Sequence, residues 1–479
     1  MVSTERKPTQ HPPAAAVDFR NRIATAERDG RRKWLYPKRP KGRFHRARAW
    51  VAAVLVGIMF GGPFVKINGN PLLMINVVER KFSVLGVIFW PQDNLIFALG
   101  FLLFLMGIAV FTAAFGRLWC GWTCPQTVMM EMVFRKIEYF IEGDSSAQKA
   151  LARAPWTADK ITRKVGKHFI FLALSFVIGN TLLAYIIGID ALKLIVTDSP
   201  SRHLTGLIFM GIFSLIFYGL FARFREQACT FICPYGRFQS TLLDENTIVV
   251  AYDYKRGEQR GRFSRRESLD QRTARGAGDC VDCFNCVRVC PTGIDIRNGT
   301  QMECVNCTAC IDACDEVMTK LGRPRGLIRF ASLNGIEKNE PIRVTPRIVG
   351  YCGILLVLGV GLLTLLLTRS EVDVTLLRAP GALFQQTPEG KISNLYLLKL
   401  TNKTHADKAV DLKLDNIAGT LTILGGQLTL PAEKQTEASV LVEIAPANLK
   451  SGTTPLVVKV YSAGQPIDKI KTIFIGPRR

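Results

Sequence analysis

Eight cysteines repeat one spacing twice between Cys280 and Cys314. The two sets are Cys280, Cys283, Cys286 and Cys290, then Cys304, Cys307, Cys310 and Cys314. Each set reads C-x-x-C-x-x-C-x-x-x-C, the spacing by which ferredoxin-type proteins hold a [4Fe–4S] cluster. The pattern therefore predicts two adjacent clusters and one-electron transfer.

The doubled spacing also assigns the ligands, because the fourth cysteine of each set reaches the other cluster in two-cluster ferredoxins. The first cluster is expected to be held by Cys280, Cys283, Cys286 and Cys314, and the second by Cys304, Cys307, Cys310 and Cys290. Pro291 supports the first set, whereas Asp315 stands where the second set would carry a proline. Zinc sites and disulfides are the alternatives. Zinc ribbons rarely use three cysteines at two successive two-residue gaps, and disulfides need an oxidising compartment.

A second cysteine pattern, C-x-x-x-C-P, also occurs twice. It comprises Cys120 and Cys124 before Pro125, and Cys229 and Cys233 before Pro234. Proline suits the first position of a helix, so Cys124 and Cys233 are expected to cap helix N-termini. The positive end of a helix favours thiolate, which binds Cu(I) or passes electrons to an oxidised metal. Inert packing of small apolar side chains is the alternative.

Other candidate ligands have weaker patterns. Met129, Met130 and Met132 could supply thioethers to copper, but a helix core is the favoured interpretation. Cys352 stands alone in an apolar run and is expected to pack. No histidine lies mid-span, so no haem site is expected, and no Rossmann or Walker fingerprint is present. The histidines are His11, His45, His168, His203 and His405.

The elements that position these residues are mostly membrane spans. The chain has 479 residues, a formal net charge of +23 and 48% hydrophobic residues, with a mean hydropathy of +0.17. The positive charge lies beside apolar runs and no nucleic-acid-binding motif accompanies it, so it indicates membrane topology and contact with anionic lipid headgroups. Five spans are expected, at residues 50–65, 94–115, 168–189, 204–224 and 348–367.

Arginine-rich connections indicate which segments stay inside the cell. The N-terminus and the clusters are expected in the cytoplasm, and the C-terminal domain in the periplasm. An amphipathic segment, Phe82–Trp90, is too short to span and is placed at the outer interface. Two-residue alternation after Arg369, separated by turn signals, predicts an immunoglobulin-like β-sandwich.

The expected fold class is an α-helical multi-span membrane protein with a cytoplasmic two-cluster ferredoxin-like module and a C-terminal all-β immunoglobulin-like sandwich. The expected domains are a disordered basic cytoplasmic arm (1–49), a membrane domain with four spans and the first C-x-x-x-C-P pair (50–225), a cytoplasmic segment with the second pair and the ferredoxin module (226–346), the last span (347–369), and the periplasmic sandwich (370–479).

The chain resembles the CcoG family, also called FixG or RdxA, along nearly its whole length. The resemblance rests on Phe89–Asp93, Trp119–Gln126, Ile141–Asp144, Cys233–Tyr235, both ferredoxin sets, Pro324–Arg329 and the C-terminal sandwich. It implies a bacterial inner-membrane protein that reduces Cu(II) to Cu(I) for assembly of cbb-type cytochrome c oxidase. The ferredoxin cysteines would hold iron, and Cys120, Cys124, Cys229 and Cys233 would bind and reduce copper.

The resemblance also implies partners: membrane lipid, copper ions, a copper chaperone or oxidase-assembly factor, and a cytoplasmic electron donor that the sequence does not identify. No nucleic acid is expected, and a homodimer is left open. Two other functions stay open. One is a quinol-linked electron-transfer protein resembling the membrane subunits of nitrate and nitrous-oxide reduction, and the other is a non-catalytic copper scaffold with structural clusters.

Overall fold

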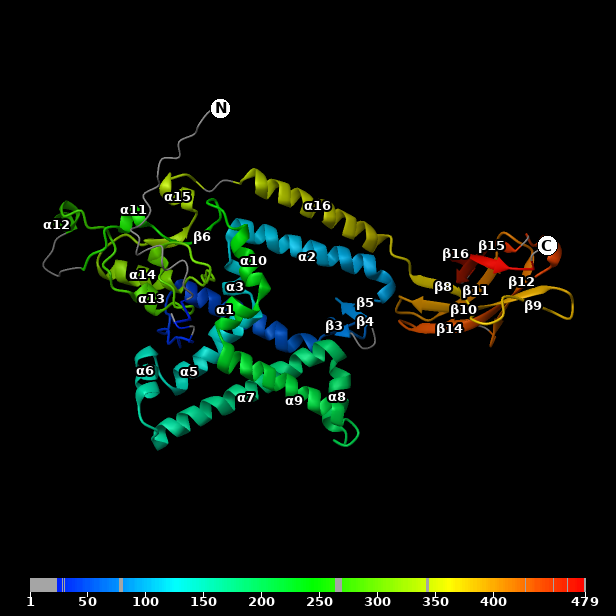
Figure 1. Ribbon diagram of the computed structural model, residues 1–479, viewed down its shortest axis with the longest axis horizontal. Helices are drawn as coiled ribbons and strands as arrows, with labels where there is room; N and C mark the ends of the chain where they lie inside the picture. Colours follow the sequence, from blue (N-terminus) through cyan, green and yellow to red (C-terminus); the bar gives the residue numbers. More distant parts are fainter. Residues whose placement is uncertain are drawn as a thin grey trace, which may run out of the picture. The chain divides into compact units, whose positions relative to one another are not determined.

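The computed structural model describes residues 24–27, 29, 31–76, 81–262, 269–341, 344–426, 428–450, 452–462 and 464–477. Its contacts divide the chain into two units (Figure 1). The first comprises Met1–Phe64 and Phe101–Gly359, and the second comprises Val65–Gly100 and Val360–Arg479. The cysteine sets and both C-x-x-x-C-P pairs belong to the first unit.

Five helices in the described part of the chain are long and apolar enough to cross a membrane, which confirms the five expected spans. They are α1 (Arg43–Gly61), α2 (Asn94–Phe115), α7 (Ala158–Ile187), α9 (Leu204–Gly219) with its π-helical extension Leu220–Phe224, and α16 (Pro346–Leu367). Helix α7 begins earlier than the expected start at His168. Its N-cap is Thr157, whose side chain accepts from the Lys160 backbone N–H, so the polar first turns are already helical.

Shorter helices connect these spans. They are α3 (Leu118–Trp122), α4 (Pro125–Val128), the π-helical turn Met129–Phe134, α5 (Arg135–Ile141), α6 (Ser145–Arg153), α8 (Ile189–Thr197), the π-helical turn Ala228–Ile232, and α10 (Pro234–Leu242). One of these π-helical turns contains Cys229, and the other begins five residues after Cys124, at the end of α4. Such turns are frequent at functional sites.

The cluster module contains a two-stranded antiparallel sheet and several short helices. The strands are β6 (Val249–Tyr252) and β7 (Ile328–Ala331), and the helices are α11 (Tyr254–Gly257), α12 (Leu269–Ala274), α13 (Asn285–Arg288), α14 (Ala309–Lys320) and α15 (Leu333–Glu337). Its apolar core includes Val250, Ile294, Ile311, Leu327 and Ile328.

The two cysteine sets share one local backbone conformation. Asp282 and Phe284 in the first set have φ values of 51° and 57°, and Asn306 and Thr308 in the second have 51° and 65°. All four residues are in the left-handed region, which non-glycine residues seldom adopt. The duplicated spacing therefore folds into a duplicated turn on each side of the module.

The N-terminal segment differs from the expected disordered arm. Residues 31–42 run as an extended segment along the first unit. The Arg39 backbone N–H donates to Asp144 Oδ1 at 2.8 Å, and the Lys38 N–H donates to the Arg288 carbonyl at 2.7 Å. The prediction of a disordered arm is therefore wrong for residues 31–49, since this segment makes these contacts and α1 begins at Arg43. Residues 1–23, 28 and 30 of the expected arm lie outside the described residues.

Asp312, on α14 between two predicted cluster ligands, caps the first membrane helix. Its carboxylate accepts from the backbone N–H of Phe44 at 3.2 Å and of His45 at 2.8 Å. Gly42 precedes the helix with φ 146°, and a Cβ there would lie 2.2 Å from Asp312 Cγ. The carboxylate meets both the unpaired N–H groups and the positive end of α1. This contact positions α1 against the cluster module.

The second unit contains the predicted β-sandwich, and the fold class is confirmed. One sheet has the order β12–β14–β10–β8 with β9 paired to β10, and the other has the order β13–β11–β15–β16. The strands are β8 (Val372–Arg378), β9 (Gln385–Gln386), β10 (Ile392–Asn402), β11 (Lys408–Leu414), β12 (Gly419–Leu424), β13 (Leu428–Leu430), β14 (Gln435–Ile444), β15 (Thr453–Ser462) and β16 (Gln465–Ile475). Alternate residues of both sheets, including Leu398, Val442 and Val458, form the core.

The expected interfacial segment Phe82–Trp90 contributes two strands to a small antiparallel sheet in the second unit. These are β4 (Lys81–Val84) and β5 (Val87–Phe89), and the third strand is β3 (Leu73–Asn76). The second unit also contains a two-stranded ribbon of β1 (Lys66–Ile67) and β2 (Asn70–Pro71). Asp93, which follows β5, forms buried ion pairs with Arg369 and Lys403, both at 2.7 Å. These pairs connect the small sheet to the start of the sandwich.

Candidate metal centres

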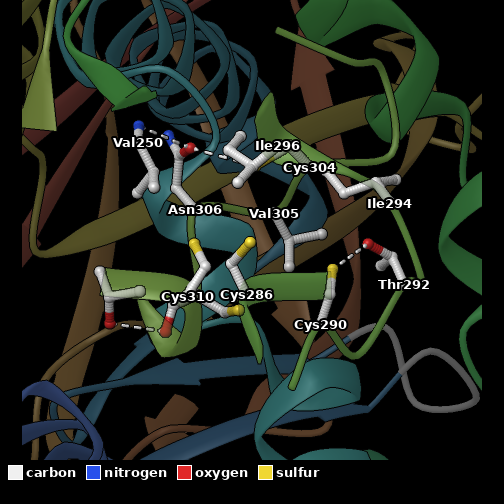
Figure 2. Close-up of a pocket in the computed structure, with 12 residues that line it drawn as sticks. Val250, Cys286, Cys290, Thr292, Ile294, Ile296, Cys304, Val305, Asn306 and Cys310 are labelled. Atoms are coloured by element: carbon white, nitrogen blue, oxygen red, sulfur yellow. Dashed lines mark hydrogen bonds between the residues drawn. The ribbon is translucent and has the colours of Figure 1, made fainter. Parts of the chain in front are cut away.

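Two cavities in the cluster module separate the eight cysteines into two groups of four. Cys290, Cys304, Cys307 and Cys310 line one cavity, shown in Figure 2, and Cys286 also contributes to its wall. Cys280, Cys283, Cys286 and Cys314 line the other. This is the grouping that the crossing assignment predicts. We call the cavity of Cys280 the first cavity and that of Cys304 the second cavity.

The donor set fits iron–sulfur ligation, although the ligand assignment itself stays a prediction. All thirteen cysteines are free thiols. Among the described residues, no three His, Cys, Asp or Glu side chains converge closely enough to hold one metal ion. The thiols instead stand around two cavities, four to each, and four thiolates are the usual ligands of a [4Fe–4S] cluster.

Burial raises the pKa of several of these thiols, which favours their protonated form. It raises the pKa of Cys286 and Cys304 to about 12 and that of Cys307 to about 11. It also raises the pKa of Cys310 well above its ordinary value. Metal ligation requires thiolates, so binding must release these protons.

The C-x-x-x-C-P pairs adopt the predicted helix-capping geometry. Cys124 is the N-cap of α4 and Cys233 is the N-cap of α10, each followed by proline at the first helical position. Thiolate at these two positions stays a prediction. The first cysteine of each pair is different: burial raises the pKa of Cys120, and raises that of Cys229 to about 12.

The two pairs meet in space although more than a hundred residues separate them. The pKa of Cys229, raised first by its burial, is raised further by the charges of Cys124, Cys120 and Cys233. Gly236, in the first turn of α10, lies so close to Cys229 that a Cβ there would be 2.4 Å from the Cys229 carbonyl oxygen. The Cys120 thiol also donates to Gln239 on α10. The two cysteine segments are therefore in contact, and we call their four cysteines the paired-cysteine site.

The paired-cysteine site lies against the second cavity. A Cβ on Gly121 would be 2.2 Å from the Val305 carbonyl oxygen and 3.1 Å from Cys307 Cα, so only glycine allows this approach. A further small cavity is lined by Cys229 together with Pro291, Thr292 and Val305. Both pairs are thus adjacent to loops that carry predicted ligands of the second cluster.

Sequence reasoning missed two polar residues of this site, Arg117 and Gln239. Arg117 Nε donates to Gln239 Oε1 at 2.9 Å, and the Cys120 thiol donates to the same oxygen at 3.2 Å. Arg117 also donates to the Met302 carbonyl, two residues before Cys304. Its position three residues before Cys120 was a usable signal.

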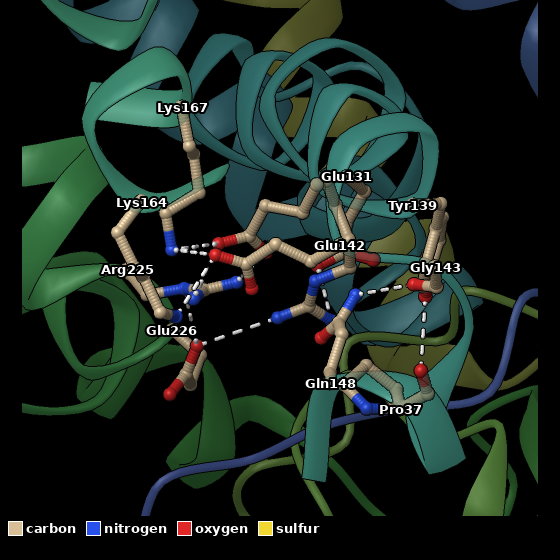
Figure 3. A network of polar contacts seen from close by, with 12 residues as sticks. Pro37, Glu131, Tyr139, Glu142, Gly143, Gln148, Lys164, Lys167, Arg225 and Glu226 are labelled. Atoms are coloured by element: carbon tan, nitrogen blue, oxygen red, sulfur yellow. Dashed lines mark hydrogen bonds and ion pairs between the residues drawn. The ribbon is translucent and has the colours of Figure 1, made fainter. Parts of the chain in front are cut away.

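A network of buried charges supports the site from the side of α5 and α7 (Figure 3). Arg225 forms two hydrogen bonds with Glu138, at 3.0 and 2.6 Å, and Lys167 pairs with Glu142 at 2.9 Å. Removing one partner of such a pair costs about 3–5 kcal/mol because it leaves a buried charge unpaired. Arg225 is therefore held firmly, and the paired-cysteine segment begins only four residues later, at Cys229.

The same network includes further charged side chains that are buried or half-buried. Glu142 is buried, which favours its neutral form, but hydrogen bonds from Lys164 and Lys167 outweigh burial and hold its pKa below the ordinary value. Arg135 is paired with Glu131 at 3.0 Å and with Glu226 at 3.5 Å. These side chains pack inside the protein and are not a solvated face.

The three methionines after the first pair are buried, whereas the last cysteine is exposed. Met129 and Met130 pack in an apolar core, and Met132 packs in another, as the helix-core interpretation states. Met130 also lines the small cavity that contains Cys229. Cys352, which was expected to pack, is instead exposed on α16.

Three family models match the chain. They are a 4Fe-4S dicluster domain over residues 224–333, a 4Fe-4S binding domain over residues 97–142, and the Ig-like fold at the C-terminus of FixG over residues 362–477. The first contains both ferredoxin sets, and the second contains Cys120 and Cys124.

Curated relatives match over most of the length. The chain is 34% identical over 440 residues to nitrogen fixation protein FixG of Rhizobium meliloti, a match that covers 83% of this chain and 82% of that protein. It is also 34% identical over 473 residues to protein RdxA of Cereibacter sphaeroides, covering 93% and 97%. Protein RdxB of the same organism is 32% identical over 424 residues, covering 84% and 87%. The chain therefore belongs to the FixG/CcoG/RdxA family and is a membrane iron–sulfur protein of electron transport.

Proposed function

We propose that this protein reduces Cu(II) to Cu(I) at the paired-cysteine site with electrons from its clusters. The observation that carries the proposal is the meeting of four thiols, from two distant segments, directly beside the loop that bears Cys307. Thiolate is the ligand that a soft cuprous ion prefers. A set of one buried and three half-buried thiols next to a one-electron carrier is suited to hold copper while it accepts one electron.

The residues of the site have separate parts in this reaction. The clusters, when bound, supply one electron at a time. Cys124 and Cys233, the N-cap residues of α4 and α10, would supply soft sulfur ligands to the arriving ion. The pKa values of Cys120 and Cys229 are raised by burial, so each of these two thiols must lose a proton to bind it. Each Cu(II) then takes up one electron, and the soft ligands favour the cuprous product over the cupric substrate.

The cellular setting is part of the proposal. Family membership supports a role in assembly of cbb-type cytochrome c oxidase, in which Cu(I) passes to a copper chaperone or an oxidase-assembly factor. A cytoplasmic donor would reduce the clusters. The N-terminus and clusters would face the cytoplasm of a bacterial inner membrane and the sandwich would face the periplasm.

Mixing the reduced protein with Cu(II) tests the reaction. Anaerobically purified protein, with iron and copper quantified, is reduced and then mixed with stoichiometric Cu(II) while cluster absorbance is followed. One Cu(I), detected with a cuprous chelator, is expected for each electron that the clusters lose. Copper bound without cluster re-oxidation would contradict the reductase and support a copper scaffold.

A second candidate is quinol-linked electron transfer, favoured by an open groove of about 590 Å³ lined by Trp156 and residues of α7 and α9. In it His168 Nδ1 and the Tyr218 hydroxyl are 2.9 Å apart, and Phe169 and Leu172 supply apolar walls. Among the described residues that line the groove, Lys164 is the one lysine or arginine, and it already pairs with Glu142 at 2.9 Å, so the groove suits a neutral head group. Re-oxidation of the clusters by a short-chain quinone, with no response to Cu(II), would support this candidate instead.

Reporter fusions test the topology. A reporter after Arg369 is expected to show a periplasmic location, and one near Gly278 a cytoplasmic location, because arginine-rich segments stay inside. Paired fusions to alkaline phosphatase, active outside, and to a fluorescent protein that folds inside give opposite readouts at each point. Opposite signals at these two positions would reject the topology, and the cytoplasmic placement of the clusters with it.

A further inference from the structure

Two buried arginines converge on the boundary between the second cavity and the paired-cysteine site. Arg117 donates to Gln239 and to the Met302 carbonyl. Arg48, on α1, donates from Nε to the Gly121 carbonyl at 2.6 Å. They are 5% and 3% exposed. Within the described residues, all the acceptors of both guanidinium groups are neutral, and neither group has a carboxylate partner.

Arg117 contacts both the loop before Cys304 and the two segments of the paired-cysteine site. It contacts the loop before Cys304 through Met302 and shares the Gln239 oxygen with the Cys120 thiol. It also reaches the second pair, since a Cβ on Gly236, beside the Cys229 carbonyl, would be 3.1 Å from Arg117 Nη2. One planar side chain thus fixes α3, α10 and the cluster loop relative to one another.

We propose that Arg117, supported by Arg48, is a positioning residue that raises the reduction potential of the second cluster and fixes the Cys120–Gly121 turn against it. A cluster gains a negative charge when it is reduced. A nearby positive charge stabilises that reduced form, strongly so where water is excluded. Arginine keeps its charge at all accessible pH values, so this effect does not depend on protonation.

Both arginines lie beside the loops of the second cavity. Arg117 contacts the Met302 carbonyl, and Arg48 contacts the carbonyl of Gly121, which packs against Val305 and Cys307. The first cavity has an arginine of its own, Arg297, but that side chain lies between two carboxylates. It pairs with Asp282 and with Asp295, each at 2.6 Å.

Redox titration of the full-length protein, monitored by electron paramagnetic resonance, tests this proposal. In Arg117→Gln, one cluster midpoint is expected to fall while the other stays constant. A tenfold loss in the reduction equilibrium is about 59 mV for one electron. Arg117→Lys keeps the charge and is expected to restore most of the potential. Arg297→Gln, the matched control at the first cavity, is expected to leave the midpoint that responds to Arg117 unchanged.

Several results would overturn the proposal. Both midpoints could stay unchanged in an Arg117→Gln protein with full iron content, or both could shift equally, which would indicate a general structural effect. A lysine variant with the same potential as the glutamine variant would show that charge is not the cause. If Arg117→Gln fails to load iron, Arg48→Gln decides the question, because it removes a charge from the same side without cutting the Met302 contact. This test does not involve copper, so its outcome does not depend on whether the protein reduces Cu(II).

Discussion

Replacing Cys286 by serine is expected to lower the iron content of the purified protein by about half or more, since each cluster needs four thiolates and this residue is a predicted ligand of the first. Cys286 is buried and lines both cavities. Loss of its thiol removes one ligand of the first cluster and disturbs the wall of the second. Iron and acid-labile sulfide are measured together with the cluster absorbance.

Cys352→Ser is the matched control for this change. It removes a thiol from α16, away from both cavities, and its side chain is exposed. Iron content and absorbance are expected to stay at the wild-type level. Unchanged iron and an unchanged spectrum in Cys286→Ser would contradict the assignment of this residue as a ligand.

The double variant Cys120→Ser, Cys124→Ser is expected to keep its cluster iron while losing copper chemistry. Cu(I) affinity should fall by about 10-fold or more, given that even outer-shell changes at metal sites cost about 10- to 100-fold. Serine has a similar size but lacks the soft donor that Cu(I) prefers. Competition with a cuprous chelator measures affinity, and the rate of Cu(II)-dependent cluster re-oxidation measures reduction.

The equivalent change in the second pair, Cys229→Ser with Cys233→Ser, should have the same effect because the two cysteine segments are in contact. Methionine variants offer a sharper comparison. Met130 lines the cavity of Cys229, whereas Met132 packs against Ala52 and Val128. If both cysteine double variants retained full copper binding and reduction, the copper assignment would be wrong. Met130→Leu, with Met132→Leu as its control, would then be the next test.

The features that sequence predicted well depend on local chemistry. The cluster spacing places three predicted ligands of each set within seven residues of sequence. Proline after Cys124 and Cys233 makes these two cysteines the N-cap residues of the helices that follow. The spans follow from long apolar runs. The alternation in the C-terminal region gives the sandwich, because each strand buries one face on its own.

The features that sequence did not predict depend on distant partners. Residues 31–42 are basic and polar, but the backbone N–H groups of Arg39 and Lys38 donate to the Asp144 carboxylate and the Arg288 carbonyl, far along the chain. In the sequence Arg117 looks like any other basic residue at the end of a membrane span. Only the fold brings it to Gln239 and Met302. The strand β4 is too short to show alternation, so its pairing with β3 was not visible.

The Asp312 cap has a consequence for the order in which this protein is made. Phe44 emerges from the ribosome 268 residues before its capping carboxylate. At about 5–20 residues per second, this interval is about 13 to 54 s. The Asp312 carboxylate can therefore accept from Phe44 and His45 only after α14 has been synthesised. The contact that caps α1 forms together with the fold of the segment that carries Cys310 and Cys314.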